Sequence, residues 1–186
     1  RDIVDNVINM DGLIEAKSVV QENGEIILYG GEEGLVNVTG TLNASGKGVG
    51  ETGGEVRITG AWVALLENAF IDVSGDLGGG TTLIGGGYQG KGLVPTSQKT
   101  YFHSTAFVTA DALTSGDGGK VILWADDTTY FYGGISAIGG YHSGDGGFVE
   151  TSGKNYLDFD GRVDVAAING MGGTVLLDPT SITLLS

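Results

Sequence analysis

Two short strand-like units recur along the 186-residue chain with the same period, and this repeat is the feature that most constrains the fold. The first unit is a glycine followed by a β-type run, with copies beginning at Gly24, Gly54, Gly80, Gly119, Gly147 and Gly173. The second is an apolar–polar–apolar triplet, with copies beginning at Ile14, Leu42, Ile71, Val108, Ile135 and Val163. Both series advance by 26–30 residues, apart from one interval in each that is about ten residues longer. A shared period with a shared exception indicates a repeated structural unit.

Alternation of apolar and polar residues within each copy predicts strands rather than helices. The middle residue of each triplet is expected to point outward, as a solvated polar ladder formed by Glu15, Asn43, Asp72, Thr109, Ser136 and Asp164. Such short strands cannot bury a core alone, but stacked turns about 4.8 Å apart can. The sequence therefore predicts an all-β parallel β-helix (a β-solenoid) of about six coils of 26–30 residues, with one insertion at 88–98. A β-sandwich is the alternative, but it predicts turns without in-phase repetition of whole units.

Composition narrows the class of partner. Glycine supplies 36 residues, and corners such as Ser74-Gly75, Gly139-Gly140 and Ser152-Gly153 are expected to use its access to positive φ. Acidic residues number 23 against 9 basic ones, and the resulting charge of −14 disfavours nucleic acid and anionic lipid. No cysteine is present, and no apolar run approaches the roughly 20 residues of a membrane span.

Three glycine-rich segments carry a likeness to a known family. They are Gly116-Asp117-Gly118-Gly119-Lys120-Val121-Ile122-Leu123-Trp124, Gly144-Asp145-Gly146-Gly147-Phe148-Val149-Glu150-Thr151 and Gly172-Gly173-Thr174-Val175-Leu176-Leu177-Asp178-Pro179. With Leu13–Ala16 and Leu83–Gly86 they resemble the filamentous haemagglutinin family, the large exoproteins of two-partner secretion, over nearly the whole chain. The Asn-Pro-Asn motifs of that family's amino-terminal secretion domain do not occur here, which suggests a segment at or just beyond the end of that domain.

The resemblance implies a right-handed parallel β-helix that is secreted to, or released from, the surface of a Gram-negative bacterium. It also implies an outer-membrane translocator as partner during export, and the missing cysteines fit a chain that crosses that membrane unfolded. We expect residues 1–186 to form a single β-helix domain, a fragment of a longer solenoid whose open ends could pair with further copies.

Catalytic and metal chemistry find little support in the sequence. The two histidines, His103 and His142, lie 39 residues apart without neighbouring ligands, so we expect no metal site, and we expect no catalytic or cofactor-binding residues. The acidic residue of each Gly-Asp-Gly-Gly corner is expected to close an Asx turn. Some β-helix proteins bind or cleave carbohydrate, and this stays an alternative.

Three groups of residues are candidates for other roles. Asn37 and Asn43 stand in Asn-x-Ser/Thr sequons and are candidate glycosylation sites. The insertion at 88–98 is a candidate binding loop, through Tyr88, Gln89, Lys91 and Leu93, because excursions from a solenoid often form its binding face. An outward apolar stripe is expected from Ile27, Tyr29, Leu83, Ile122, Trp124 and Leu176.

An exposed stripe of this kind marks an interface or is covered by another segment. The insertion or the stretch 99–107 could cover it, and packing against a sister chain is the sharper hypothesis. Together these features predict a non-enzymatic shaft that attaches the cell to a host or bacterial surface receptor or to a polysaccharide. A self-assembling filament subunit is the alternative.

Overall fold

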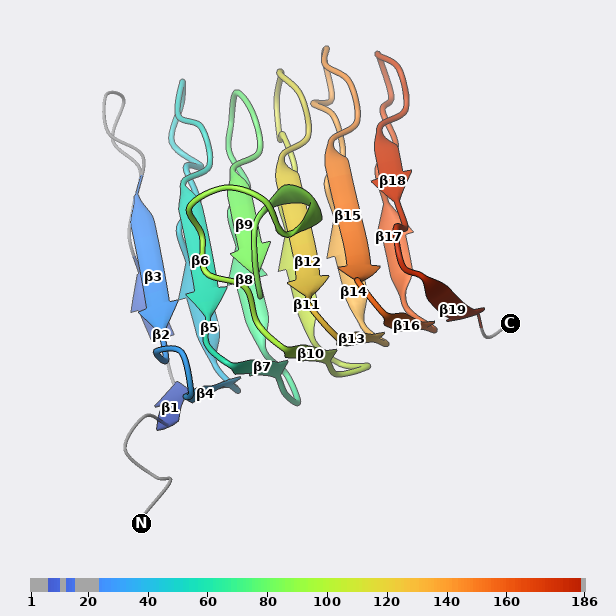
Figure 1. Cartoon of the computed structure of the whole chain (residues 1–186). Helices are drawn as coiled ribbons and strands as arrows, with labels where there is room; N and C mark the ends of the chain where they lie inside the picture. The colour runs from blue at the N-terminus through green and yellow to red at the C-terminus, as the bar shows by residue number, and fades with distance from the viewer. Residues whose placement is uncertain (1–6, 11–12, 16–23, 185–186) are drawn as a thin grey trace.

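The computed structural model describes residues 7–10, 13–15 and 24–184, which form a parallel β-solenoid of about six turns (Figure 1). Each strand pairs in parallel with its counterpart one turn later, so the turns stack in sequence order from the N-terminal to the C-terminal end (Figure 1). The predicted β-helix is confirmed. Every strand pair in the described part of the chain is parallel, so the sandwich alternative is wrong.

Three sheets form the faces of the solenoid. The first sheet holds β1 (Val7–Met10), β4 (Leu35–Val38), β7 (Trp62–Leu65), β10 (Lys99–Phe102), β13 (Thr128–Phe131), β16 (Tyr156–Phe159) and β19 (Ser181–Leu184). The second holds β2 (Leu13–Glu15), β5 (Thr41–Asn43), β8 (Phe70–Asp72), β11 (Phe107–Thr109), β14 (Gly134–Ser136) and β17 (Arg162–Asp164). The third holds β3 (Glu25–Tyr29), β6 (Glu55–Thr59), β9 (Thr81–Ile84), β12 (Lys120–Ala125), β15 (Phe148–Gly153) and β18 (Thr174–Leu176).

The two repeats found in the sequence are the second and third sheets. From β5 to β14 and from β6 to β15 the inward positions are buried as expected, and Leu42, Ile71 and Val108 stack in one fully buried column along β5, β8 and β11. In the last turn, Val163 is only half-buried and Val175 is exposed. The first sheet was missed as a repeat, although its strands recur in phase with the other two. Inside it the rings of Phe102, Phe131 and Phe159 stack with centroids 5.1 and 5.0 Å apart. Identical registers on successive turns thus produce columns of like side chains.

The glycine corners use positive φ at Gly78, Gly116 and Gly144, but the corner glycines named from the sequence work by steric fit. Gly75, Gly140 and Gly153 do not have the positive φ that we expected of them. Instead, a Cβ would approach neighbouring backbone too closely, at 2.7 Å from the Thr52 carbonyl carbon for Gly75 and 2.5 Å from the Ser115 Cα for Gly140. Successive turns therefore pass each other at these corners with no room for a side chain.

The long interval of the repeat is an excursion from the stack. Residues 85–98 leave the solenoid between β9 and β10 and contain the short 3₁₀ helix η1 (Tyr88–Gly90). In Figure 1 this green segment passes across the front of the third sheet. Within the described residues, no helix is long and apolar enough to cross a membrane.

Candidate functional site

The excursion packs against the outer face of the third sheet, over the indole of Trp124. A Cβ on Gly86 would lie 2.8 Å from Cδ1 of that ring, and one on Gly90 would lie 2.5 Å from its Cε2. Both glycines also have positive φ, at 152° and 65°. The backbone can therefore lie directly on the indole because these two positions lack side chains. The indole N–H donates to Asp126 Oδ1 at 3.0 Å, which fixes the ring beneath the excursion.

Polar contacts tie the excursion to the second and third turns after it, which carry β15 and β18. The backbone N–H of Gln89 donates to both carboxylate oxygens of Glu150, at 3.0 and 3.2 Å. The Gln89 side chain donates to Asp178 Oδ2 at 3.0 Å and accepts from Lys91 Nζ at 2.8 Å. Gln89 adopts φ 54°, a left-handed conformation that is uncommon outside glycine and that turns its N–H toward Glu150. Gln89 thus anchors the excursion.

Glu150 is a fully buried carboxyl on the outer side of β15. Burial raises its pKa, and the hydrogen bonds from Gln89 and Ser152 oppose that rise. Burial of Glu150 disfavours its charged form, while the hydrogen bond from the Gln89 N–H favours that form. The contact between excursion and sheet is therefore sensitive to the charge of one group.

The predicted apolar stripe divides into a covered part and an open part. Leu83, Ile122 and Trp124 form a buried cluster with Val94 of the excursion and Phe148 packed against it, and Ile122 is 0% exposed. The hypothesis that a sister chain covers these three residues is wrong, because the excursion already covers them. Ile27 and Tyr29 stay 55% and 49% exposed on β3, and Leu176 is half-buried. An interface at Ile27 and Tyr29 stays a prediction.

The remaining residues of the candidate binding loop face solvent. Tyr88 and Leu93 are exposed, and so is Lys91. The Tyr88 ring is held edge-to-face against Phe148 at 5.8 Å, with Lys120 Nζ 5.7 Å from its centroid. Any ligand of the loop would thus meet Tyr88, Lys91 and Leu93, whereas Gln89 is engaged within the chain.

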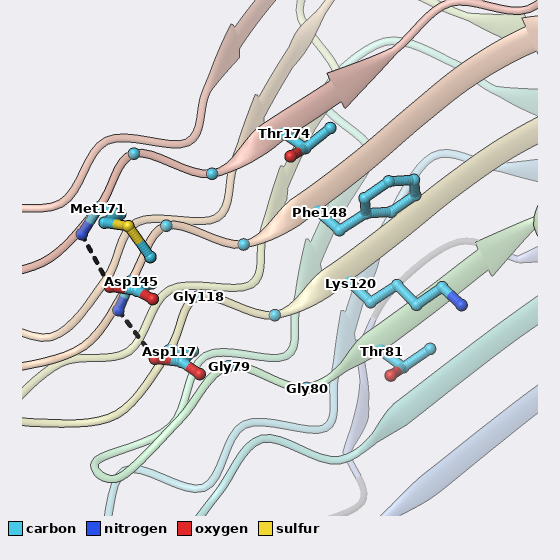
Figure 2. A pocket seen from close by; sticks show the side chains of 15 residues that line it. Gly79, Gly80, Thr81, Asp117, Gly118, Lys120, Asp145, Phe148, Met171 and Thr174 are labelled. Carbon is cyan, nitrogen blue, oxygen red and sulfur yellow. Dashed lines mark hydrogen bonds between the residues drawn. The ribbon is translucent and has the colours of Figure 1, made fainter.

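A groove runs along the corner between the second and third sheets, where two columns of glycine leave no side chains (Figure 2). Its floor is backbone, and its rims carry Asp117 and Asp145 on one side and Lys120 on the other. Asp117 Oδ1 accepts from the Asp145 N–H at 2.8 Å, and Asp145 Oδ1 accepts from the Met171 N–H at 2.7 Å (Figure 2). The expected Asx turns are therefore wrong here, because each aspartate bridges to the next turn instead.

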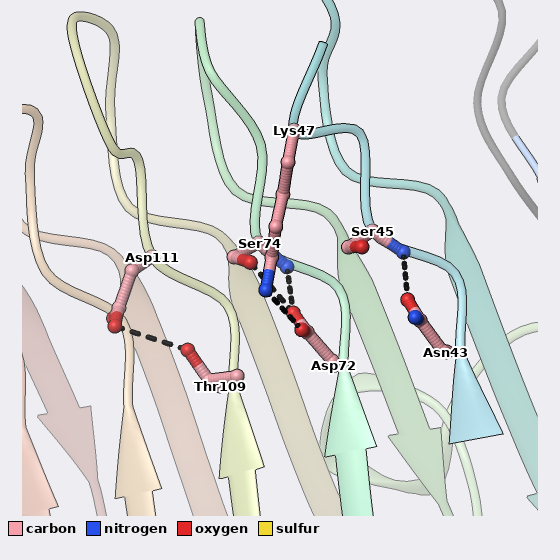
Figure 3. Close-up of polar contacts among 7 residues, drawn as sticks. All are labelled: Asn43, Ser45, Lys47, Asp72, Ser74, Thr109 and Asp111. Atoms are coloured by element: carbon pink, nitrogen blue, oxygen red, sulfur yellow. Dashed lines mark hydrogen bonds and ion pairs between the residues drawn. The ribbon is translucent and has the colours of Figure 1, made fainter. Parts of the chain in front are cut away.

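Asx-type contacts occur where strands of the second sheet end (Figure 3). The side-chain oxygens of Asn43 and Asp72 accept from the backbone N–H two residues later, at 3.0 and 2.9 Å. Asp72 also pairs with Lys47 Nζ at 2.7 Å and is buried, and Ser136 is buried too. From Asn43 to Asp164 the polar ladder points outward as predicted, but loops cover part of it, so the expected solvation is wrong at Asp72 and Ser136. The side chain of Glu15 lies outside the described part of the chain.

The other sequence candidates lie apart from one another. Asn37 is half-buried on the outer face of β4, and Asn43 is half-buried at the end of β5 with its Oδ1 already engaged by the Ser45 N–H. His103 contacts Thr105 at 3.0 Å and lies on the first sheet side, while His142 lies in an exposed corner. Among the described residues no group of three or more His, Asp or Glu side chains could hold a metal.

Sequence reasoning missed an aromatic surface on the first sheet. Trp62 of β7 is 52% exposed, and Lys99 Nζ lies 5.1 Å from its ring centroid. One register column reads Asn37, Ala64, Tyr101, Tyr130 and Asp158 on consecutive turns. Because Ala64 is small, a hollow of about 270 Å³ opens above it between Trp62 and Tyr101, which we call the aromatic slot.

Neighbouring rings hold the slot's tyrosines in place. Tyr132 packs edge-to-face on Tyr101 at 5.9 Å, and its hydroxyl donates to Asp158 Oδ2 at 2.8 Å. Burial first, and then the contact with Asp158, raises the pKa of Tyr132, so the phenol stays a neutral donor. In-phase alternation in Trp62-Val63-Ala64-Leu65 and Lys99-Thr100-Tyr101-Phe102 was the available signal.

Comparison with known proteins finds similarity among solved structures. No protein-family model and no curated protein matches the chain. Among solved structures, the chain is similar to the crystal structure of the HMW1 secretion domain from Haemophilus influenzae, with a TM-score of 0.68 and 29% sequence identity. The match covers 96% of this chain and 46% of that one, so the chain spans just under half the length of its structural neighbour. The predicted exoprotein segment is supported in this general form, as a solenoid similar to a bacterial secretion domain, without singling out the filamentous haemagglutinin family.

Proposed function

We propose that this chain is a structural segment of a secreted exoprotein on the surface of a Gram-negative bacterium, where it acts as a rigid shaft in attachment. The observation that carries the proposal is the match over 96% of the chain, at 29% identity, to a secretion domain. The three-segment resemblance to two-partner secretion exoproteins points the same way. The role is structural rather than catalytic.

Stiffness follows from the ladder of hydrogen bonds between turns. Each turn pairs with the next along all three sheets, so bending the axis strains three ladders at once. Stacked rings such as Phe102 on Phe131, and bridges such as Asp117 to the Asp145 N–H, add contacts between the same turns. Such a rod can hold surface features at a distance from the cell, including the excursion at 85–98.

Export through an outer-membrane translocator is part of the proposal. The chain has no cysteines, so no disulfide would lock it before it crosses that membrane. Because each turn contacts only its neighbours, folding can propagate turn by turn as the chain emerges. The cell surface is then the place where the solenoid forms.

The export step is tested in cells. The exoprotein that carries this segment is expressed in a Gram-negative host with and without an outer-membrane translocator, and surface exposure is measured by external protease and immunoblotting. We expect exposed or released protein only with the translocator. Equal exposure without it would refute the two-partner route.

The attachment step is tested with the purified chain. Beads coated with the folded chain are compared with beads coated with the heat-unfolded chain for retention on epithelial and bacterial cell layers. We expect retention to depend on the folded chain. Equal retention of both bead types would refute the attachment role.

A filament subunit is the second candidate, favoured by the last described turn. Val175, Ile182 and Leu184 are exposed, although each continues an inward column whose previous members are Val149, Leu157 and Phe159. A further turn stacked on these columns would bury them, and in a filament that turn would come from a second copy of the chain. Fibres with a regular axial repeat in electron micrographs of the purified chain would support this candidate, and a monodisperse monomer at high concentration would refute it.

A further inference from the structure

We propose that the aromatic slot on the first sheet binds one ring of a neutral hexose oligosaccharide, and that neighbouring rings of the same glycan lie along the tyrosine column. The inference gives a ligand class to the attachment role proposed above, and its biological meaning rests on that role.

Register creates the slot and sets its size. Asn37, Ala64 and Tyr101 occupy the same outward column on three consecutive turns, and the short side chain of Ala64 leaves a gap beside Tyr101. On the preceding turn the hollow is lined by Leu35 rather than by Asn37. The resulting hollow of about 270 Å³ lies just below the usual range for sites of drug-sized ligands and suits a single six-membered ring.

The walls combine aromatic rings with polar tips. Trp62 forms one wall, and Tyr101 with Tyr130, whose ring centroids lie 6.4 Å apart, forms the other. The face of an aromatic ring is electron-rich and attracts the slightly positive C–H groups on the apolar face of a sugar. The tyrosine hydroxyls and the Lys99 ammonium at the rim can bond to the sugar hydroxyls. An amphipathic ring with an apolar face and a polar edge matches this arrangement.

The platform is fixed before a ligand arrives. Tyr132 supports Tyr101 from one side and is itself held by Asp158 at 2.8 Å, while Lys99 lies over Trp62. Few side chains therefore need to be ordered on binding, which lowers the entropic cost. Tyr132 and Asp158 act as positioning residues and not as ligand contacts.

Charge and shape separate a neutral glycan from other occupants. Nucleic acid bases also stack on aromatic rings, but the net charge of −14 repels a polyanion, and Lys99 is the one cation that lines the slot. Stable protein partners bury about 800 Å² on each side around a broad apolar centre. Here the slot is one ring wide and polar residues Asn37 and Asp158 bound its column.

The test titrates the purified chain with cellohexaose and maltohexaose, and with a thymidine oligonucleotide as the polyanion. Binding is followed by calorimetry and by the fluorescence of Trp62, since Trp124 is buried beneath the excursion. We expect saturable binding of at least one hexaose with a Kd of about 1 mM or tighter. No saturable hexaose binding, or binding of the oligonucleotide in preference, would overturn the proposal.

Three variants locate the binding. Ala64→Leu fills the slot and should abolish binding, and Tyr101→Ala removes one wall and should weaken it at least about tenfold. Phe107→Ala is the matched control, because it removes an exposed ring from the second sheet. Thermal melting checks that each variant is folded. If Ala64→Leu does not fold, Tyr101→Ala alone tests whether the sugar binds at the slot. Equal affinity of Tyr101→Ala and Phe107→Ala for the hexaose would overturn the assignment of the binding site. If the chain binds no sugar but coated beads still attach to cells, the binding proposal fails and the attachment role stands.

Discussion

Substituting Gly146 by alanine tests whether the glycine corners are required by steric fit between turns. A Cβ at this position would lie 2.8 Å from the Val165 carbonyl carbon and closer still to its oxygen. Carbon atoms in contact normally stay about 3.5–4.0 Å apart. The turn that carries Val165 would therefore have to move away by about 1 Å, or the corner of Gly146 would have to open by the same amount.

The size of the effect follows from the hydrogen bonds at this corner. The Gly146 N–H donates to Met171 O at 2.8 Å, and the Gly173 N–H donates to Val165 O at 2.7 Å. A displacement of about 1 Å weakens both, at about 1 kcal/mol each, and residual crowding adds a further 1–2 kcal/mol. We expect a loss of about 3 kcal/mol in the free energy of unfolding, which lowers Tm by about 6–12 °C in a chain of this size.

Gly172→Ala is the matched control, because Gly172 occupies the same corner position one turn later. A Cβ there would have no atom within 4 Å, and its φ is not in the left-handed region. We expect its Tm to stay within about 2 °C of wild type or to rise slightly, since alanine restricts the unfolded chain. Calorimetry of both variants gives the comparison. Equal Tm values for Gly146→Ala and Gly172→Ala would refute the steric account of the corners.

Three further changes probe the excursion and the polar ladder. Because burial raises the pKa of Glu150, the folded state loses stability as pH rises above 4.5, the ordinary pKa of that carboxyl. Glu150→Gln should therefore have a higher Tm than wild type at neutral pH, and this difference should disappear in acid. Trp124→Ala should lower stability by about 3–5 kcal/mol and speed tryptic cleavage after Lys91, measured by mass spectrometry, because the excursion loses the ring it rests on. Lys47→Met should lower the free energy of unfolding by about 1 kcal/mol, and by less at high salt, because buried Asp72 loses its ion pair. Melting curves of Lys47→Met that match wild type at both about 0.1 M and about 1 M salt would contradict this.

Period and alternation were enough to predict the solenoid because each turn repeats the environment of the last. A residue such as Val108 is buried by its equivalents Ile71 and Ile135 on the neighbouring turns, so the pattern along the sequence is also the pattern in space. Glycine-led strands and apolar triplets therefore identified the second and third sheets. The first sheet escaped because its strands share no punctuating residue, although they alternate in phase with the rest.

The candidate surfaces were harder to predict because they depend on contacts between different turns. The stripe that includes Trp124 was expected to be covered by the insertion, by residues 99–107 or by a sister chain, and only the path of residues 85–98 shows that the insertion covers Trp124. Asp117 was expected to accept a hydrogen bond within its own loop, but its Oδ1 accepts from the N–H of Asp145 on the next turn. Local spacing cannot distinguish a partner two residues ahead from one a whole turn ahead.

The same stacking rule explains how one rod can carry different surfaces. Inward positions must match from turn to turn, because a change of size in one turn opens a void or a clash against both neighbours. Outward positions meet solvent, so Ala64 can follow Asn37 and precede Tyr101 without disturbing the core below them. The excursion shows that a larger change outside the core is also tolerated, since residues 85–98 are added at one corner. The Ser97 N–H donates to Gly85 O at 2.8 Å, which closes the excursion, and β10 then resumes the register set by β7. Binding features in such a protein are therefore expected where an outward column breaks its own pattern, and the Ala64 gap and the covered Trp124 are the two clearest breaks described in this chain.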